Sequence, residues 1–220
     1  MTDEFQTQVI HIGDWVIRQR VPGGKGPFPA IFMFHGWTGD ENVMWIYATR
    51  MPRNTLLIAP RGLYPTPLGG HGWHAYKAKI WPLVDDFRPS IASLAELLNS
   101  SNFPLVDFDR LHFVGFSQGA AMAYAFALEH GERLASVAGL SGFLPERAEL
   151  APANNGLRNK PIFIAHGNQD YLVPVYRARE SVNLFQKAGA RVTYCEDDVG
   201  HKLSANCFRG LQTFYANQEF

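Results

Sequence analysis

The stretch Leu111-His112-Phe113-Val114-Gly115-Phe116-Ser117-Gln118-Gly119-Ala120-Ala121 decides how this chain is expected to fold. A short apolar run ends at Gly115, a serine follows two residues later, and an alanine-rich run extends from Gly119 to Leu128. This order predicts a strand, a sharp turn and a helix, with Ser117 at the tip of the turn. The pattern also arises by chance in surface turns, but its strand-like and helix-like flanks favour a serine presented for nucleophilic attack.

The rest of the chain alternates between continuous apolar runs and amphipathic segments. Residues 7–12 and 15–20 indicate a hairpin around Gly13-Asp14. Apolar runs without alternation are typical of strands buried on both faces of a parallel sheet. The pattern therefore predicts an α/β fold, a mostly parallel sheet with helices on both faces. The later strands are expected at 30–34, 55–59, 111–114, 134–140, 161–165 and 191–196, and the helices at 42–51, 85–98, after Ser117, at 175–187 and at 203–215.

The composition is that of a globular domain without a charge bias. The chain has 220 residues, of which 46% are hydrophobic and 13% aromatic, so we expect a single domain over 1–220 with no separate cap domain. Twenty basic and 20 acidic side chains give a formal net charge of zero, which gives no reason to expect nucleic acid or an anionic membrane as a partner. No run approaches the ~18 apolar residues of a membrane span.

The cysteines and the first residues bear on the expected compartment. Residues 1–5 are acidic and no apolar segment follows them, so we expect no secretory signal. The two cysteines, Cys195 and Cys207, are too few for a disulfide framework or a metal site. We therefore expect both to be free thiols in a reducing compartment, and the protein to be cytoplasmic.

A nucleophilic serine needs a base that takes its proton and an acidic group that orients the base. After a strand–serine–helix turn, the acid comes next along the chain and the histidine last. Asp170 lies just past the expected strand at 161–165, so its side chain should reach the same sheet edge as Ser117. Asp197 and Asp198 are the alternatives, but they have no strand of their own to fix them. We therefore expect Asp170 to be the acid.

The base is expected to be His201. It directly follows the strand at 191–196, and no other of the eight histidines lies downstream of Asp170. The remaining candidates have other expected roles: His71 and His74 lie in an irregular loop and are the main alternatives, His35 and His166 should shape loops, and His112 should be buried.

Two backbone N–H groups are expected to bind the oxyanion of a tetrahedral intermediate. One belongs to Gln118, directly after the serine and at a helix N-terminus whose dipole favours negative charge. The other should come from the loop at 35–39, after an early central strand, where we choose the N–H of Trp37. Each such donor is typically worth about 3–4 kcal/mol in the transition state.

Residues 62–84 interrupt the alternation of strands and helices. The segment is rich in proline and glycine and has no period. A long loop inside a compact domain is usually functional, and loops at the carboxyl ends of strands surround the site in α/β sheets. We expect Trp73 and Trp81 to form a wall of the substrate pocket; plain packing over the sheet edge is an equal alternative.

Six segments together resemble the phospholipase/carboxylesterase family of the α/β-hydrolases, which includes acyl-protein thioesterases and small bacterial carboxylesterases. They are Phe34-His35-Gly36, Pro60-Arg61-Gly62, Gly115-Phe116-Ser117-Gln118-Gly119, Leu140-Ser141-Gly142-Phe143-Leu144-Pro145, His166-Gly167-Asn168-Gln169-Asp170-Tyr171-Leu172-Val173-Pro174 and Gly200-His201. The resemblance implies the α/β-hydrolase fold and hydrolysis of carboxylic esters without a cofactor. It implies the same nucleophile, acid and base, and the backbone of Trp37 and Gln118 for the oxyanion.

Two positions depart from the family pattern. After His35-Gly36 the family often has one small aliphatic residue, whereas here Trp37 and Thr38 introduce an indole and one more residue, which should narrow the acyl pocket. Ala120 stands where the thioesterases usually carry glycine. The chain therefore looks closer to the small bacterial carboxylesterases.

We therefore expect a serine carboxylesterase that hydrolyses short- to medium-chain carboxylic esters through an acyl-enzyme, with a small-molecule ester as its partner. No metal or cofactor is expected, because the sequence has no His-x-x-x-His pair, cysteine cluster, Walker loop or Gly-x-Gly-x-x-Gly. Three alternatives stay open: an acyl-thioesterase, a lysophospholipase of the same family, and a catalytically silent hydrolase fold used as a binding module. The sequence does not fix the acyl-chain length, the physiological substrate or the oligomeric state.

Overall fold

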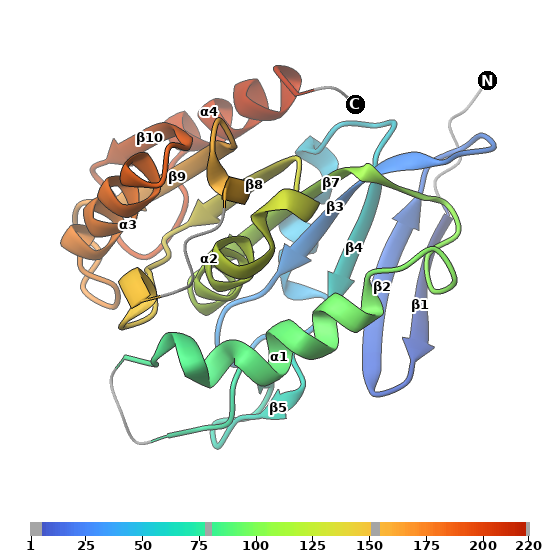
Figure 1. Ribbon diagram of the computed structural model, residues 1–220, viewed down its shortest axis with the longest axis horizontal. Helices are drawn as coiled ribbons and strands as arrows, with labels where there is room; N and C mark the ends of the chain where they lie inside the picture. Colours follow the sequence, from blue (N-terminus) through green and yellow to red (C-terminus); the bar gives the residue numbers. More distant parts are fainter. Residues whose placement is uncertain (1–5, 78–80, 151–154, 219–220) are drawn as a thin grey trace.

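Eight strands form one sheet in the part of the chain that the structure describes, residues 6–77, 81–150 and 155–218 of a computed structural model (Figure 1). They are β1 (Gln6–Ile12), β2 (Trp15–Val21), β3 (Phe28–Phe34), β4 (Leu56–Pro60), β7 (Val106–Phe116), β8 (Ser136–Leu140), β9 (Pro161–Gly167) and β10 (Arg191–Asp197). Their order in the sheet is β1-β2-β4-β3-β7-β8-β9-β10. The pairs β1–β2 and β2–β4 are antiparallel, and all later neighbours are parallel.

Helices cover both faces of this sheet. They are the α-helices α1 (Val84–Leu97), α2 (Gln118–His130), α3 (Val175–Lys187) and α4 (Ala205–Ala216), and the 3-10 helices η1 (Val43–Arg50), η2 (Gly131–Arg133), η3 (Ala148–Leu150) and η4 (Asn155–Leu157). The first three α-helices share one apolar core with the sheet, whereas η1 and α4 share a second core on the other face. In β3, Phe32 and Phe34 face the first core and Ile31 and Met33 the second, as expected for a strand buried on both sides. The predicted α/β-hydrolase fold class is confirmed.

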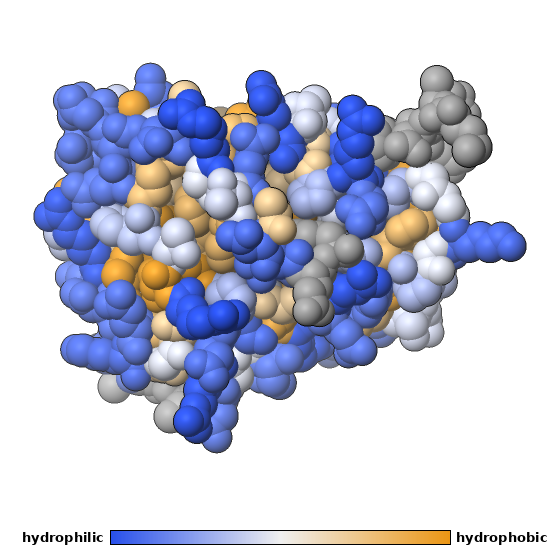
Figure 2. Space-filling view, turned by 90° about the horizontal axis from the view of Figure 1, so that it is seen from above, coloured by the Kyte–Doolittle hydropathy of each residue, from blue (hydrophilic) through white to orange (hydrophobic). Residues whose placement is uncertain are grey.

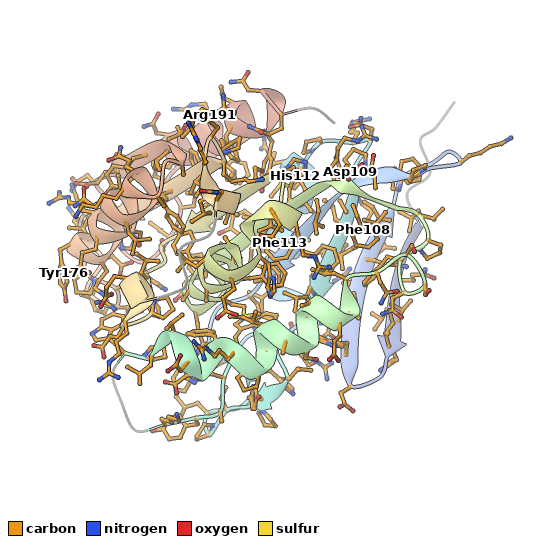
Figure 3. All side chains as sticks on the ribbon, in the orientation of Figure 1. Phe108, Asp109, His112, Phe113, Tyr176 and Arg191 are labelled. Carbon is orange, nitrogen blue, oxygen red and sulfur yellow. A yellow bond between two sulfur atoms is a disulfide. The ribbon has the colours of Figure 1, made fainter. Side chains whose placement is uncertain are left out.

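The site lies at the edge where the parallel strands end. In Figure 3, Asp109 and Arg191, near the beginnings of β7 and β10, lie at the top of the view, so the strands run downward from there. Figure 2 looks onto this upper face, where hydrophilic side chains surround an apolar area on the side that carries α3 and β10. Ser117, Asp170 and His201 all follow the other ends of their strands. The chemistry is therefore gathered at the carboxyl edge of the sheet, as the fold predicts.

Several elements differ from their expected form. The segment at 42–51 is a 3-10 helix rather than an α-helix, and its buried Met44 and Tyr47 lie three residues apart, the spacing that places two side chains on one side of a three-residue turn. β7 begins at Val106, five residues earlier than its apolar run. The irregular segment at 62–84 contains a two-stranded ribbon, β5 (Tyr64–Pro65) and β6 (His71–Gly72), too short to leave a periodic pattern. These differences arise where packing, rather than local preference, sets the conformation.

The prediction that Cys195 and Cys207 are free thiols is wrong. The two sulfur atoms form a disulfide that joins β10 to the first turn of α4. The cysteines lie 12 residues apart in sequence, and α4 folds back along β10 so that their Cα atoms are 5.5 Å apart. A cysteine count contains no information about this approach. The argument for a reducing compartment is lost with the free thiols, and the cytoplasmic location stays a prediction without that support.

The described helices include none that is long and apolar enough to cross a membrane, in line with the lack of a long apolar run in the sequence.

Breaking this disulfide is expected to destabilise the fold. A bond that closes a loop of about this length removes conformations from the unfolded chain and typically contributes about 3 kcal/mol. We expect the free energy of unfolding of the Cys195→Ser/Cys207→Ser variant to be lower than that of the oxidised protein by about 2–4 kcal/mol. Urea unfolding followed by circular dichroism measures it, and coincident unfolding curves would contradict the link's stabilising role.

Candidate active site

Ser117 occupies a strained turn between β7 and α2. Its backbone has φ 54° and ψ −119°, a left-handed conformation that costs about 1–3 kcal/mol for a residue with a Cβ. The surrounding backbone holds this conformation: the N–H of Ser117 donates to the carbonyl of Leu140 at 2.9 Å, and its carbonyl accepts from the N–H of Ala120 at 3.0 Å. The turn places Ser117 in the wall of a cavity. This is the geometry of a serine held ready for attack.

Asp170 and His201 meet at the same sheet edge. Nδ1 of His201 lies 2.7 Å from Oδ2 of Asp170, and the aspartate is buried. The other carboxylate oxygen, Oδ1, accepts the backbone N–H groups of Leu172 and Val173 at 3.0 and 2.9 Å. Because a carboxylate accepts, the proton of the imidazole lies on Nδ1, which leaves Nε2 without one. His201 lines the same cavity as Ser117.

A second imidazole, His166, lies behind the acid. It is buried at the end of β9, and its Nε2 donates to the carbonyl of Val173 at 2.7 Å and lies 3.4 Å from Oδ2 of Asp170. Burial lowers the pKa of His166, against the opposing effect of the Val173 carbonyl. The ring is therefore neutral and acts as a fixed hydrogen-bond donor. It holds the 170–173 turn closed around the carboxylate, which fits the loop-shaping role expected of it.

His35 performs a similar task in the loop after β3. Its Nε2 accepts the N–H of Gly62 at 2.9 Å, so its proton lies on Nδ1, which donates to the carbonyl of Gly36 at 2.7 Å. The N–H of Gly39 donates to the same carbonyl at 3.0 Å. In a trans peptide the N–H points opposite to the carbonyl, so the N–H of Trp37 is directed away from His35. Burial lowers the pKa of His35 to about 4, which keeps the ring neutral.

Gln118 ties the 62–84 segment to the turn at Ser117. Its side-chain Oε1 accepts the backbone N–H of Trp73 at 3.0 Å, and its Nε2 lies 2.9 Å from Nε2 of His74. Nδ1 of His74 in turn donates to the carbonyl of Ala75 at 2.8 Å. His74 therefore lines the cavity as an acceptor for Gln118.

The two tryptophans expected in the pocket wall lie in different places. Trp73 is 0% exposed, donates its indole N–H to the carbonyl of His35 at 2.7 Å and packs against Phe34. It lies behind the wall and is not among the residues that line the cavity. Trp81 does line it, in edge contact with Phe143 and with the guanidinium of Arg177 4.6 Å above its ring. A sequence pattern does not distinguish the two because both lie in the same aperiodic segment.

The alternative site residues have other partners. His71 belongs to the β5–β6 ribbon, and its backbone N–H donates to the carbonyl of Gly39. The carboxylate of Asp198 accepts from the side chain of Gln169 at 2.6 Å. His112, labelled in Figure 3, is buried in β7 between Ser136 and the ring of Tyr215. These three side chains do not line the cavity that contains Ser117 and His201.

The cavity beside Ser117 has a volume of about 480 Å³ and mostly apolar walls. The indole of Trp37 is 41% exposed and stacks on Tyr76, with the ring centroids 6.3 Å apart and the planes at 15°. Sequence reasoning missed part of this wall, although Phe116, Phe143 and Val173 lie inside the family-like segments. Its aromatic members are Trp37, Tyr76, Trp81, Phe116 and Phe143, and Leu172 and Val173 add aliphatic surface.

Comparison with known proteins agrees with this geometry. The family described as Phospholipase/Carboxylesterase matches residues 21–218. Acyl-protein thioesterase 1 of Schizosaccharomyces pombe is 31% identical over 196 residues, which cover 83% of this chain and 81% of that protein. The structure of a carboxylesterase from Mesorhizobium loti has a TM-score of 0.83 at 20% identity, covering 96% of this chain and 99% of that one. The Bacillus cereus carboxylesterase has a TM-score of 0.80 at 22% identity, covering 92% and 93%. At these identities the two structures show a shared fold.

The buried histidines make the stability of the protein depend on pH. Burial lowers the pKa of both His35 and His112 from 6.5 to about 4. Below pH 6.5 the unfolded chain binds more protons than the folded one, so the free energy of unfolding should fall as the pH drops from 6.5 to 4, by up to about 3 kcal/mol per histidine. Urea unfolding at several pH values measures this. The His112→Asn variant should show a shallower fall, and an unchanged slope would contradict the assignment.

Proposed function

This chain belongs to the phospholipase/carboxylesterase family of the α/β-hydrolases, and from that premise we propose that it is a serine carboxylesterase acting on short- to medium-chain carboxylic esters. One observation carries the proposal: the 2.7 Å contact between His201 and Asp170 beside the cavity that Ser117 and His201 share. A hydroxyl, an imidazole and a carboxylate in this order form the relay that makes serine nucleophilic.

In the first half of the reaction, Ser117 Oγ attacks the ester carbonyl carbon. Nε2 of His201 takes the hydroxyl proton as the bond forms. Asp170 keeps the imidazole in the Nδ1–H tautomer and stabilises the imidazolium, and the carboxylate is itself fixed by the N–H groups of Leu172 and Val173. His201 then gives the proton to the leaving alcohol, and the acyl group remains on Ser117.

The oxyanion of each tetrahedral intermediate would accept hydrogen bonds from the backbone N–H groups of Trp37 and Gln118. Gln118 begins α2, where the helix dipole favours negative charge. The peptide of Trp37 is oriented by His35 through the carbonyl of Gly36, which supports its N–H as the second donor. In the second half of the reaction, water attacks the acyl-enzyme while His201 again acts as the base, and the acid product leaves.

The cavity supports a small, apolar ester as the substrate. Its walls are aromatic and aliphatic, and Trp37 and Trp81 contribute large flat surfaces to it. The reaction needs only the three side chains and the two N–H groups, so the proposal includes no metal and no cofactor. We also propose that residues 1–220 act as one domain without a cap domain, which the single sheet of the described residues supports.

An acyl-thioesterase is the second candidate, favoured by the 31% identity to acyl-protein thioesterase 1 of Schizosaccharomyces pombe. The same serine, acid and base would act on a thioester carbonyl. Turnover of an ester and a thioester with identical acyl groups separates the two activities. A higher kcat/KM for the thioester would replace carboxylesterase by thioesterase in the proposal.

An active-site probe tests whether Ser117 is nucleophilic. A fluorophosphonate should label the protein, and Ser117→Ala should abolish the labelling and lower kcat by about 10³-fold or more, because no other group takes over the attack. Ser101→Ala, at an exposed turn, is the matched control and should label normally. Absence of labelling in the intact protein would favour a catalytically silent binding module.

A substrate series tests the role of the indole of Trp37. In p-nitrophenyl esters of increasing acyl length, we expect Trp37→Ala to raise kcat/KM for the longer esters relative to acetate by at least about fivefold, because removing an indole enlarges the cavity while the backbone N–H stays. Trp45→Ala, in η1 and away from the cavity, should leave the ratios unchanged. Identical ratios in Trp37→Ala and the unaltered protein would show that this side chain does not select the substrate.

A further inference from the structure

The Cys195–Cys207 disulfide closes the segment of chain that carries His201. Cys195 lies in β10 at the edge of the sheet, and Cys207 lies in the first turn of α4. The residues between them leave the sheet, pass the acid at Asp170 and enter the helix. The proposed base therefore lies near the middle of a covalently closed loop.

The first half of this loop is fixed to the neighbouring strand end. The N–H of Asn168 donates to the carbonyl of Asp197 at 2.9 Å, and the N–H of Gln169 donates to the carbonyl of Val199 at 3.1 Å. Gly167 lies so close to this part that a Cβ would stand 2.1 Å from the carbonyl oxygen of Val199. The residues before His201 are thus held by the segment that also carries Asp170.

The second half is held mainly by the segment itself. The N–H of Lys202 donates to the carbonyl of Gly200 at 2.7 Å, and Ser204 Oγ accepts the N–H of Cys207 at 3.0 Å, which caps α4. The carboxylate of Asp197 also accepts a hydrogen bond from Ser204. Without the disulfide, this hydrogen bond would join the two stems of the loop, in competition with water. The covalent bond is therefore the strong tie between the stem after His201 and the sheet.

We propose that this disulfide is a redox-sensitive positioning device for the base: its reduction loosens the His201 loop and lowers turnover, and its reformation restores turnover. The inference rests on the proposed function, because it needs His201 to act as the base. The imidazole has to keep its 2.7 Å contact with Asp170 while Nε2 faces the serine, and displacements of about 1 Å in such an arrangement can cost about 100-fold in rate.

The reductant would be a dithiol. Its thiolate attacks Sγ of Cys195, which lies on the edge strand and is partly exposed, and Cys207 leaves as a thiolate at the N-terminal end of α4, where the helix dipole favours negative charge. The second thiol of the reductant then displaces Cys195. Two electrons and two protons pass from the dithiol to the protein, so that the reductant becomes a cyclic disulfide and both cysteines become thiols.

Steady-state kinetics of the full chain in both redox states tests the proposal. We expect dithiothreitol to lower kcat for a p-nitrophenyl ester at least about tenfold, with KM changed less than about twofold, because the cavity walls stay in place while the base loses its position. Reoxidation should restore kcat. The Cys195→Ser/Cys207→Ser variant should show the low kcat under both conditions, and circular dichroism at the assay temperature checks that each form is folded.

Amide hydrogen exchange gives a second readout that does not need turnover. Reduction should speed exchange at residues 198–204 and leave α2 protected. Equal kcat in the two redox states, a higher kcat after reduction, or unchanged exchange at 198–204 would each overturn the proposal. An oxidised protein that neither turns over esters nor reacts with a fluorophosphonate would instead refute the proposed function; faster exchange after reduction would then still show that the disulfide restrains this loop.

Discussion

The close approach of α2 to the ends of two central strands is the constraint on which the site depends. A Cβ at Gly119 would stand 2.1 Å from the carbonyl oxygen of Phe34, and one at Gly115 would stand 2.2 Å from the carbonyl oxygen of Gly119. Only glycine allows this contact. It seats the first turn of α2 directly against the end of β3, so that Ser117 and the loop at 35–39 become neighbours. The strain at Ser117 is the cost of this arrangement and is held in place by packing on every side.

Two buried histidines build the loops around that serine in the same way. His35 and His166 each end a strand, each precede a glycine, and each donate a hydrogen bond to a backbone carbonyl. Burial lowers the pKa of both rings, so they remain neutral donors over the range in which His201 must titrate to act as a base. Three histidines at one sheet edge therefore have two kinds of task, set by their surroundings: two fix backbone and one moves a proton.

The parts of the site that follow from strand order could be predicted from the sequence. Ser117, Asp170 and His201 each come directly after an apolar run, and parallel strands end at one edge, so their meeting requires only the fold. The placement of Trp73 behind the wall and the pairing of Cys195 with Cys207 depend on how a segment turns in space after it leaves the sheet. Neither periodicity nor composition encodes that direction, and the same holds for the stacking of Trp37 on Tyr76.

The most direct test of the account is a crystal structure of the protein after reaction with a phosphonate ester. The account predicts a phosphonyl group on Ser117 Oγ, with its oxygen accepting from the N–H groups of Trp37 and Gln118, and Nε2 of His201 within hydrogen-bond distance of the adduct while Nδ1 keeps its contact with Asp170. A phosphonyl group on another residue, or an imidazole of His201 turned away from the adduct, would contradict it.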